Sequence, residues 1–294
     1  MVGIDPAVCT IAAQWFGANA RDLPWRAADR SPWGVVVSEV MLQQTPVSRV
    51  LPAWTAWMQR WPTPSALAAA PTSEVIRMWG RLGYPRRALR LQAAAVAMVE
   101  RHEGEVPAPL EDLLALPGIG VYTARAVAAF AFGQPHPVVD VNVARVLARV
   151  VDSQPQPPAQ VRRADLERLL EALPADPVVS VQSCAGLMEL GAVVCTSRSP
   201  DCAVCPLSTN CRWLKHGRPG ADAAPARTQA WDGTDRQCRG RIMSMLREST
   251  EPVAPQGIDA LWPHDDQRQR CLDSLLADGL AHRLPDGRIT LPQT

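Results

Sequence analysis

Four cysteines in one short segment constrain this chain more than any other feature of its sequence. Cys195, Cys202, Cys205 and Cys211 follow the spacing C-x6-C-x2-C-x5-C. Thiolates are soft ligands that suit zinc or an iron–sulfur cluster. Structural zinc usually takes two close ligand pairs, and only Cys202 and Cys205 form such a pair here. The spacing therefore favours a loop around a 4Fe–4S cluster, with zinc and a disulfide framework as the alternatives.

The rest of the composition is typical of a cytoplasmic protein. The other four cysteines are isolated, as buried small apolar residues usually are: Cys9, Cys184, Cys238 and Cys271. The first residues lack a basic region followed by an apolar run, so we expect no secretory signal. No stretch approaches the roughly 20 apolar residues that span a bilayer. Since the formal net charge is only +1, any nucleic-acid-binding surface has to be a local patch.

Apolar residues recur at three- and four-residue intervals through most of the chain, which predicts a protein made of helices. Residues 218–234 are small, polar and rich in Pro and Gly, which is typical of a linker. Beyond them, three short helical patterns precede two strand candidates around Asp286 and Gly287, a hairpin signal. These elements suggest a small winged-helix-like module; the alternative is a helical tail that packs on the main body.

The segment LLALPGIGVYTARAV, residues 113–127, predicts two helices joined by a tight turn. We expect the first helix to end at Leu116, and the turn consists of Pro117, Gly118, Ile119 and Gly120. Backbone N–H groups at the start of the second helix suit an anionic phosphate, so this pattern is typical of a helix-hairpin-helix that contacts the DNA backbone. Many helical hairpins need glycines for geometry alone, which is the other explanation.

Asp140 follows the hairpin, at the start of another apolar helix pattern. An aspartate in this place is an ordinary helix N-cap. The order of the features, with a hairpin first, then this acidic residue and then the cysteine loop, favours a functional role as well.

Together these features resemble the helix-hairpin-helix DNA glycosylases that carry an iron–sulfur loop, and among them the MutY adenine glycosylases. The segments that match are LPWR (residues 23–26), SEVMLQQT (38–45), RLGY (81–84), LPGIGVYTA (116–124) and MELGAVVC (188–195). The similarity covers about residues 8–212. SEVMLQQT best separates MutY-like enzymes from the endonuclease III relatives.

The resemblance implies an all-α fold with a defined division into domains. An N-terminal helix (1–22) would join residues 133–212 in a domain that holds the catalytic aspartate and the 4Fe–4S cluster. Residues 23–132 would form a six-helix barrel domain with the helix-hairpin-helix. The active site would lie in the cleft between these two domains. The residue pattern of the tail, and not the resemblance, adds a linker (213–234) and the winged-helix-like module (235–294).

The resemblance also assigns the chemistry of adenine release. Breaking an N-glycosidic bond requires a proton donor for the base and an anion near the oxocarbenium-like sugar. Glu39 stands among apolar residues, which raise the pKa of a carboxylic acid, and it would protonate N7 of adenine. Asp140, ionised, would stabilise the sugar cation. Tyr122 would assist on the sugar side, and Asn142 would place the water, although Asn142 could simply hydrogen-bond the start of a helix.

Lys215 is the only lysine of the chain. Tyr122 stands where the bifunctional relatives carry the lysine that forms a Schiff base, so we expect a monofunctional enzyme that leaves an abasic site. The alternatives are an endonuclease III-like bifunctional enzyme acting on oxidised pyrimidines, and a non-catalytic DNA-binding protein that keeps the cluster. The second would be expected to have lost Glu39 or Asp140.

The target base lies inside the duplex, so the enzyme has to flip it out and fill the gap. By resemblance, an apolar wedge and amides would do so, formed by Leu42, Gln43, Gln44 and Thr45. Gln44 and Tyr84 would contact the partner base, and Arg26 and Glu189 would line the adenine pocket. An amide or an aromatic ring at such places can also be a plain surface or core residue.

The C-terminal part departs from the family pattern, because typical MutY chains continue into a sizeable Nudix-like domain that recognises 8-oxoguanine. The partner-base preference is therefore left open. From the resemblance we expect a monomer that binds double-stranded DNA with adenine opposite 8-oxoguanine or guanine at the bacterial nucleoid. Four arginines of the tail could contact the duplex or form a solvated face: Arg236, Arg239, Arg241 and Arg247. The sequence does not reveal a protein partner such as a sliding clamp.

Overall fold

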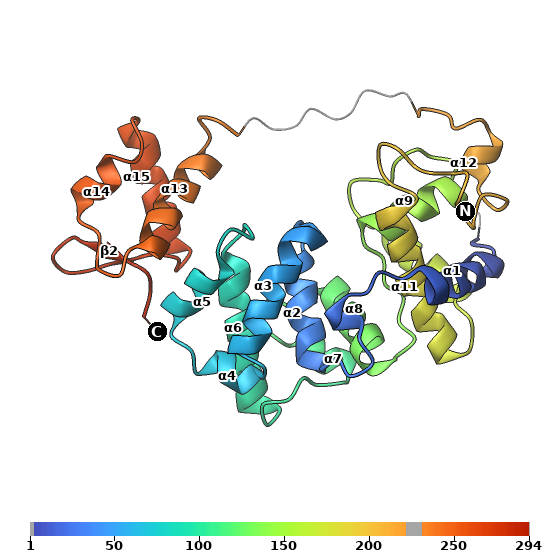
Figure 1. Ribbon diagram of the computed structural model, residues 1–294, viewed down its shortest axis with the longest axis horizontal. Coiled ribbons are helices and arrows are strands. Elements are labelled where there is room, and N and C mark those ends of the chain that lie inside the picture. Colours follow the sequence, from blue (N-terminus) through green and yellow to red (C-terminus); the bar gives the residue numbers. More distant parts are fainter. Residues whose placement is uncertain (1–2, 222–230, 294) are drawn as a thin grey trace. The chain divides into compact units, whose positions relative to one another are not determined.

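The computed structural model describes residues 3–221 and 231–293. Helices make up nearly all of its regular structure (Figure 1), and one two-stranded sheet occurs among the residues described. This confirms the all-α prediction. The middle of the expected linker, residues 222–230, lies outside the described residues. Within the part of the chain that is described, no helix has the length and apolar character needed to cross a membrane.

The chain divides into two compact units. The first unit comprises residues 1–36, 108–115 and 119–225, and the second comprises residues 37–107, 116–118 and 226–294. This division differs from the expected domains, whose boundaries stay predictions. The boundary between the units falls inside α2 (Pro32–Leu42).

The helices of the first unit are α1 (Pro6–Asn19), η1 (Pro24–Arg26), α7 (Leu110–Leu114), α8 (Val121–Phe132), α9 (Val141–Val150), α10 (Arg163–Ala172), α11 (Pro177–Val193) and α12 (Arg212–Lys215). The second unit contains α3 (Val47–Arg60), α4 (Pro64–Ala68), α5 (Thr72–Trp79), α6 (Arg86–Arg101), α13 (Asp235–Glu248), α14 (Pro255–Asp259), α15 (Asp265–Ala277), β1 (His282–Arg283) and β2 (Ile289–Thr290).

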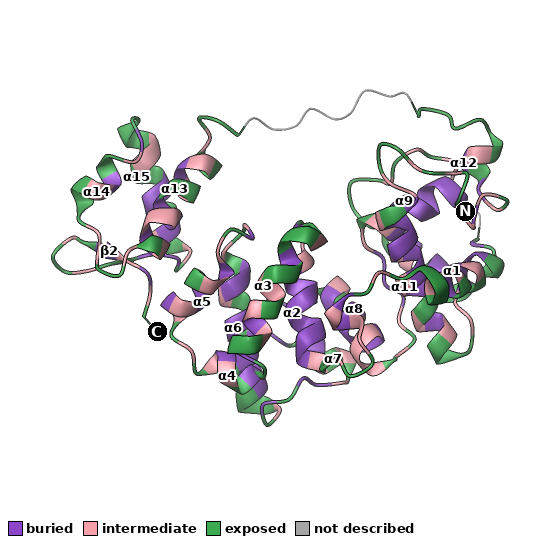
Figure 2. Ribbon diagram, in the orientation of Figure 1, coloured by how far each residue is buried: buried purple, intermediate pink, exposed green. Residues whose placement is uncertain are grey.

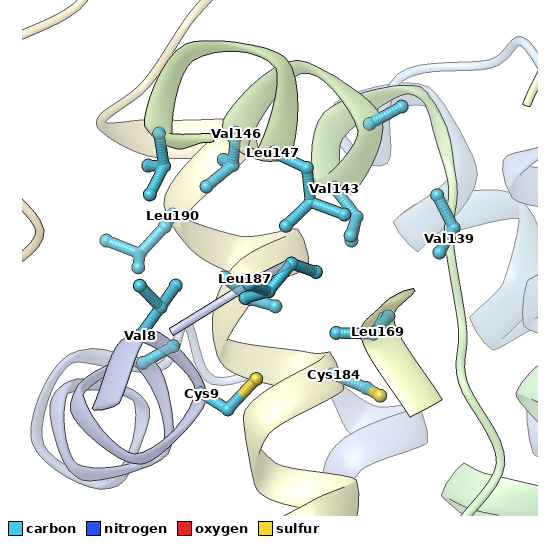
Figure 3. Packing of buried hydrophobic residues seen from close by; sticks show 14 of the residues in the cluster. Val8, Cys9, Val139, Val143, Val146, Leu147, Leu169, Cys184, Leu187 and Leu190 are labelled. Carbon is cyan, nitrogen blue, oxygen red and sulfur yellow. The ribbon is translucent and has the colours of Figure 1, made fainter. Parts of the chain in front are cut away.

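Helix α11 organises the core of the first unit. It begins after Asp176, whose carboxylate accepts hydrogen bonds from the backbone N–H groups of Val178 and Val179, an ordinary N-cap. Side chains of α1, α9, α10 and α11 meet in one apolar cluster (Figure 3), and α9 is buried along most of its length (Figure 2). Removal of this apolar surface from water is the main force that holds the unit together.

Two glycines bring the neighbouring helices unusually close to α11. A Cβ atom on Gly186 would lie 2.2 Å from the backbone oxygen of Ala12 in α1. A Cβ atom on Gly191 would lie 2.7 Å from the backbone oxygen of Asn142 at the start of α9. Any side chain at either position would force the helices apart, so these glycines are there for space and not for turn geometry.

Three tryptophans fill the core of the second unit. Trp57 contacts Trp61 and Trp79 edge to face, with ring centroids 4.7 and 5.6 Å apart. All three side chains are buried. Such pairs stabilise a core beyond the area that they bury.

The C-terminal residues form three helices and a hairpin, as predicted. Strands β1 and β2 pair antiparallel, with His282 opposite Thr290, and Ile289 forms a further bridge to Val253. The module has its own apolar core, and Ile76 of α5 belongs to the same cluster. Arg247 donates to the carbonyl of Gly80 at 2.7 Å. The module is therefore a folded body that also packs on α5.

The helix before the hairpin turn ends earlier than expected. Helix α7 stops at Leu114 and not at Leu116. Pro117 disfavours helical backbone at the residue before it, which accounts for the early end. Helix α8 begins at Val121, as the pattern predicted.

We predict that Gly186→Ala destabilises the protein by about 3 kcal/mol, because the added methyl group collides with the α1 backbone. Gly17→Ala is the matched control. Gly17 lies near the end of α1 with open space around its Cα, so alanine there should be neutral or stabilising by about 0.5–1 kcal/mol. Urea unfolding measures both, and equal effects of the two substitutions would refute the packing argument.

Candidate functional site

Asp140 caps helix α9 and is held on both carboxylate oxygens. Its Oδ1 accepts from the backbone N–H of Val143 at 2.7 Å, and its Oδ2 accepts from the side-chain amide of Asn142 at 2.7 Å. The pKa of Asp140 is raised above its ordinary value, because burial outweighs the lowering by these hydrogen bonds and by the charge of Arg145. The N-cap role is thus real, and it fixes the carboxylate in one orientation.

Arg145 connects this pair to the cysteine loop. Its guanidinium donates to Asn142 Oδ1 at 2.8 Å, to the carbonyl of Gly191 at 2.6 Å and to the carbonyl of Cys195 at 2.8 Å. The side chain is buried. Sequence reasoning missed Arg145; the available signal was an arginine placed within an otherwise apolar helix.

Arg149, one turn further along α9, holds the cysteine loop itself. It donates to Cys195 Sγ at 3.2 Å, to the carbonyl of Thr196 at 2.8 Å and to that of Ser197 at 3.1 Å. Its guanidinium lies 4.7 Å from the ring centre of Trp213. The start of the loop is therefore tied to α9 by a buried cation.

The four cysteines line one cavity, together with Arg149, Leu207 and Trp213 among other residues. Burial raises the pKa of the Cys205 thiol to about 11 and also raises that of Cys211. Among residues 3–221 and 231–293, no group of three or more His, Cys, Asp or Glu side chains is placed to hold a single metal ion. The four thiols thus face one shared space.

Glu189 is fully buried and paired with two arginines. Arg21 donates to both of its oxygens, at 2.6 and 2.8 Å, and Arg26 donates to Oε2 at 2.9 Å. Burial raises the pKa of Glu189, but the hydrogen bonds from Arg21 and Arg26 outweigh it and lower the pKa to about 2. The structure pairs Arg26 with Glu189 and adds Arg21, which the sequence did not indicate; that Arg26 and Glu189 line the adenine pocket stays a prediction.

Arg26 keeps one donor unused. Its Nη1 is buried and has no hydrogen-bond partner among the residues that the structure describes. A buried donor without a partner costs free energy, and an acceptor on a bound ligand would satisfy it.

Tyr122 and the hairpin turn lie at the start of α8. Tyr122 packs, partly buried, against the apolar cluster that includes Val139 and Val143, the neighbours of Asp140. Gly118 has a φ of 76°, and a Cβ there would lie 2.6 Å from Arg90 Cβ, so this position requires glycine. Pro117, Gly118 and Gly120 are exposed, while Ile119 is buried.

In the second unit, the end of α2 and the segment around Tyr84 carry the wedge residues. Glu39 is buried at 7% exposure, Leu42 and Gln43 are half-buried, and Gln44 is exposed. Gln44 and Tyr84 have φ values of 55° and 46°. Left-handed backbone at residues other than glycine is costly and clusters at functional sites.

Arg87 joins these two segments, and the sequence did not indicate it. The buried guanidinium donates to the carbonyls of Val40, Met41 and Gln43 on one side, and to those of Leu82 and Gly83 on the other. It also donates to Thr45 Oγ1 at 3.0 Å and lies 5.7 Å from the ring centre of Tyr84. One side chain thus fixes Gln44 and Tyr84 relative to each other.

The structure brings the expected residues together in three groups. Asp140 and Asn142 are linked to the cysteine loop, Arg26 pairs with Glu189, and the residues Leu42–Thr45 are joined to Tyr84. The common cleft expected for Glu39, Tyr122 and Asp140 stays a prediction.

We predict that Glu189→Gln lowers the free energy of unfolding by about 3 kcal/mol at pH 7, because a pKa held at about 2 instead of 4.5 stabilises the folded state. This stabilisation is complete above about pH 4.5 and is lost as the pH falls through 2, so the difference should be roughly half as large at pH 3. Urea unfolding at the two pH values measures it.

The exposed Glu171→Gln is the matched control for that experiment and should change stability little at either pH. A loss for Glu189→Gln that does not vary with pH would show that the carboxylate charge is not what stabilises the site.

Comparison with known proteins places the chain in a family. The HhH-GPD superfamily of base excision DNA repair proteins matches residues 37–172. An adenine DNA glycosylase of Mycolicibacterium smegmatis is 52% identical over 278 residues, which cover 94% of this chain and 93% of the relative. One of Mycobacterium tuberculosis is 50% identical, covering 95% and 91%.

A solved structure described as a thermostable thymine-DNA glycosylase aligns with a TM-score of 0.63 at 25% identity, covering 71% of this chain and 96% of that one. The fold is thus shared by glycosylases that act on different bases. Sequence identity distinguishes them, because it is 50–52% to the adenine DNA glycosylases and 25% to this structure. The chain therefore belongs to the HhH-GPD superfamily of base excision DNA repair proteins and, within it, to the adenine DNA glycosylases.

Proposed function

We propose that the chain is a monofunctional adenine DNA glycosylase that removes adenine opposite 8-oxoguanine or guanine and leaves an abasic site. The observation that carries this proposal is the Asp140 carboxylate, capped on α9 and fixed by Asn142. It lies in a chain that aligns with adenine DNA glycosylases over more than nine-tenths of its length.

The proposed chemistry uses two carboxyl groups in different states. Glu39, buried on α2, donates a proton to N7 of adenine, so that the base leaves neutral as the N-glycosidic bond breaks. Asp140, ionised, stabilises the positive sugar. Water then adds to C1′ and returns a proton to Glu39, with Asn142 and Tyr122 assisting on the sugar side.

The absence of strand cleavage follows from residue identity. A lyase step needs an amine that forms a Schiff base with the sugar. Lys215, the only lysine of the chain, is exposed on α12, and Tyr122 occupies the corresponding hairpin position. The endonuclease III-like alternative therefore lacks its nucleophile there.

In this proposal the pair Arg26 and Glu189 recognises the extrahelical adenine. Gln44 and Tyr84 recognise the partner base. The buried, unused Nη1 of Arg26 suits an acceptor on adenine. The strained, exposed Gln44 and Tyr84 suit insertion into the stack and contact with the partner base. The hairpin turn, residues 117–120, would bind a phosphate.

A 4Fe–4S cluster is the cofactor that the cysteine loop fits best. Cys195, Cys202, Cys205 and Cys211 line one cavity, and their spacing holds only one close pair, whereas structural zinc usually takes two. Arg149 supplies a positive charge beside Cys195. The cluster would shape the loop and take no part in breaking the glycosidic bond.

The proposed partner is double-stranded DNA at the nucleoid, bound by a monomer. The family acts in base excision repair, which supports DNA as the partner.

The decisive test is single-turnover base release from duplexes that hold adenine opposite 8-oxoguanine, guanine or cytosine, each read with and without alkali. We expect cleavage only after alkali, and fastest opposite 8-oxoguanine. Glu39→Gln and Asp140→Asn should each slow release by about 10²- to 10⁴-fold while duplex binding persists, and Glu171→Gln should not slow it.

Strand cleavage without alkali would contradict monofunctional chemistry, and absence of adenine release would contradict the whole proposal. Loss of duplex binding in both carboxyl variants would mean that Glu39 and Asp140 hold the structure and do not act on the substrate.

The cluster is tested by Cys202→Ser, which should abolish the visible absorbance of the purified protein and lower its iron content. Cys9→Ala is the control, because Cys9 is buried in the apolar cluster of the first unit, away from the cysteine loop in sequence. Zinc in place of iron in the unsubstituted protein would overturn the assignment.

A further inference from the structure

Arg236 of the C-terminal module lies against Tyr84, a residue expected to contact the partner base, and Trp231, just before the module, lies against Arg236. The guanidinium of Arg236, at the start of α13, lies 5.5 Å from the ring centre of Tyr84 and 5.2 Å from that of Trp231. The three side chains thus alternate ring, cation, ring. Tyr84 is 49% exposed and Trp231 is 50% exposed, so aromatic surface on both sides of the cation faces solvent.

Arg236 differs from the other arginines of α13. Arg239 pairs with Asp278 at 2.7 Å, Arg241 donates to the carbonyl of Leu261, and Arg247 donates to that of Gly80. Arg236 is exposed and has no hydrogen bond or ion pair in the part of the chain that the structure describes. Three of the four tail arginines are therefore engaged within the protein, and only Arg236 keeps its donors available.

The acidic residues nearest to Arg236 in sequence are already engaged. Asp235 accepts from Arg270 at 2.9 Å and from Gln267 at 2.9 Å, and Asp232 accepts from Gln237. On the other side, Arg81 is exposed three residues before Tyr84, and Arg49 donates to the Arg81 carbonyl. Arg81 thus adds positive charge on the Tyr84 side of the stack, although the net charge of the chain is only +1.

Both rings are held by the backbone that carries them. The carbonyl of Trp231 accepts from Thr234 Oγ1 at 2.7 Å, and Thr234 caps α13. Tyr84 follows the segment that Arg87 fixes to the end of α2. Rings that are fixed before binding lose little conformational freedom when they contact a ligand.

From this geometry we propose that Tyr84, Arg236 and Trp231 form one binding surface for the DNA strand that carries the partner base. Arg236 contacts a phosphate and Trp231 stacks on a base or sugar next to the one that Tyr84 contacts. The inference rests on the proposed function, because that function is what places DNA at Tyr84. Single strands displaced from a regular duplex are bound in this way, by aromatic rings beside positive charge.

This surface gives the short tail a specific role. The module packs on α5 and places Arg236 against Tyr84, with Trp231 against Arg236, so that the segment contacting the partner base is built from both ends of the second unit. The module would strengthen binding of the partner strand without placing a recognition helix in the major groove. In agreement with this, the arginines of α15 are paired with acids: Arg268 with Asp259 and Asp265, and Arg270 with Asp235.

The test compares Arg236→Ala and Trp231→Ala with the unsubstituted chain. Fluorescence anisotropy gives the Kd for a duplex with 2′-fluoro-2′-deoxyadenosine, which resists hydrolysis, opposite 8-oxoguanine. We expect each substitution to weaken binding about tenfold. Arg283→Ala is the matched control, since Arg283 is an exposed arginine on β1 of the same module, and it should leave the Kd within about twofold.

The strand is identified by photocrosslinking with 5-iodouracil placed beside the partner base or, in a second duplex, beside the adenine. A crosslink from the partner strand that disappears in Trp231→Ala supports the proposal. Three results would overturn it: unchanged Kd in both variants, with only a lower melting temperature; equal weakening by Arg283→Ala; or a crosslink from the adenine strand alone. Failure of the unsubstituted chain to release adenine would instead refute the underlying function.

Discussion

Close packing around helix α11 is the constraint on which the first unit depends. Gly186 admits the backbone of α1 and Gly191 admits the start of α9, each nearer than any side chain allows. The same helix carries Glu189 to Arg21 and Arg26, and the cysteine loop begins just beyond its end at Val193. Because interiors tolerate little change in volume, the position of α11 fixes the N-terminal segment, Asp140 and the cysteine loop together.

Buried arginines then fix the backbone of the functional segments. Arg87, Arg145 and Arg149 donate mainly to main-chain carbonyls, in contrast to the acid-paired arginines of the surface. A guanidinium has five donors in a planar fork, so one side chain can satisfy several carbonyls that turn away from helices. Burial lowers the pKa of Arg87 to about 10, which leaves it charged at neutral pH. The cost of burying this charge is offset by its hydrogen bonds, which also hold the segment of the proposed wedge in place.

Some of the candidate functional residues can be recognised from their chemical type within a motif. Others can be recognised only from their contacts in the folded structure. Glu39, Asp140, Tyr84 and the cysteines stand in motifs whose residue types match a reaction or a ligand, so the sequence alone indicates them. Arg21 hydrogen-bonds Glu189 across 168 residues of chain, and Arg87 bonds carbonyls more than forty residues away. Nothing in the local pattern around either arginine distinguishes it from the many surface arginines of the chain.

By itself, the sequence determined the helical class, the hairpin turn, the three-helix tail with its strands and the residue types of the site, because periodicity, turn residues and motif spacing are local properties. Only the tertiary structure decided that Arg26 keeps an unused donor, that Arg145 connects Asn142 to the cysteine loop and that Arg236 lies against Tyr84. These facts depend on which carbonyls and rings come within hydrogen-bonding or van der Waals distance after the helices pack. Such contacts join residues far apart in the sequence, so no local sequence pattern predicts them.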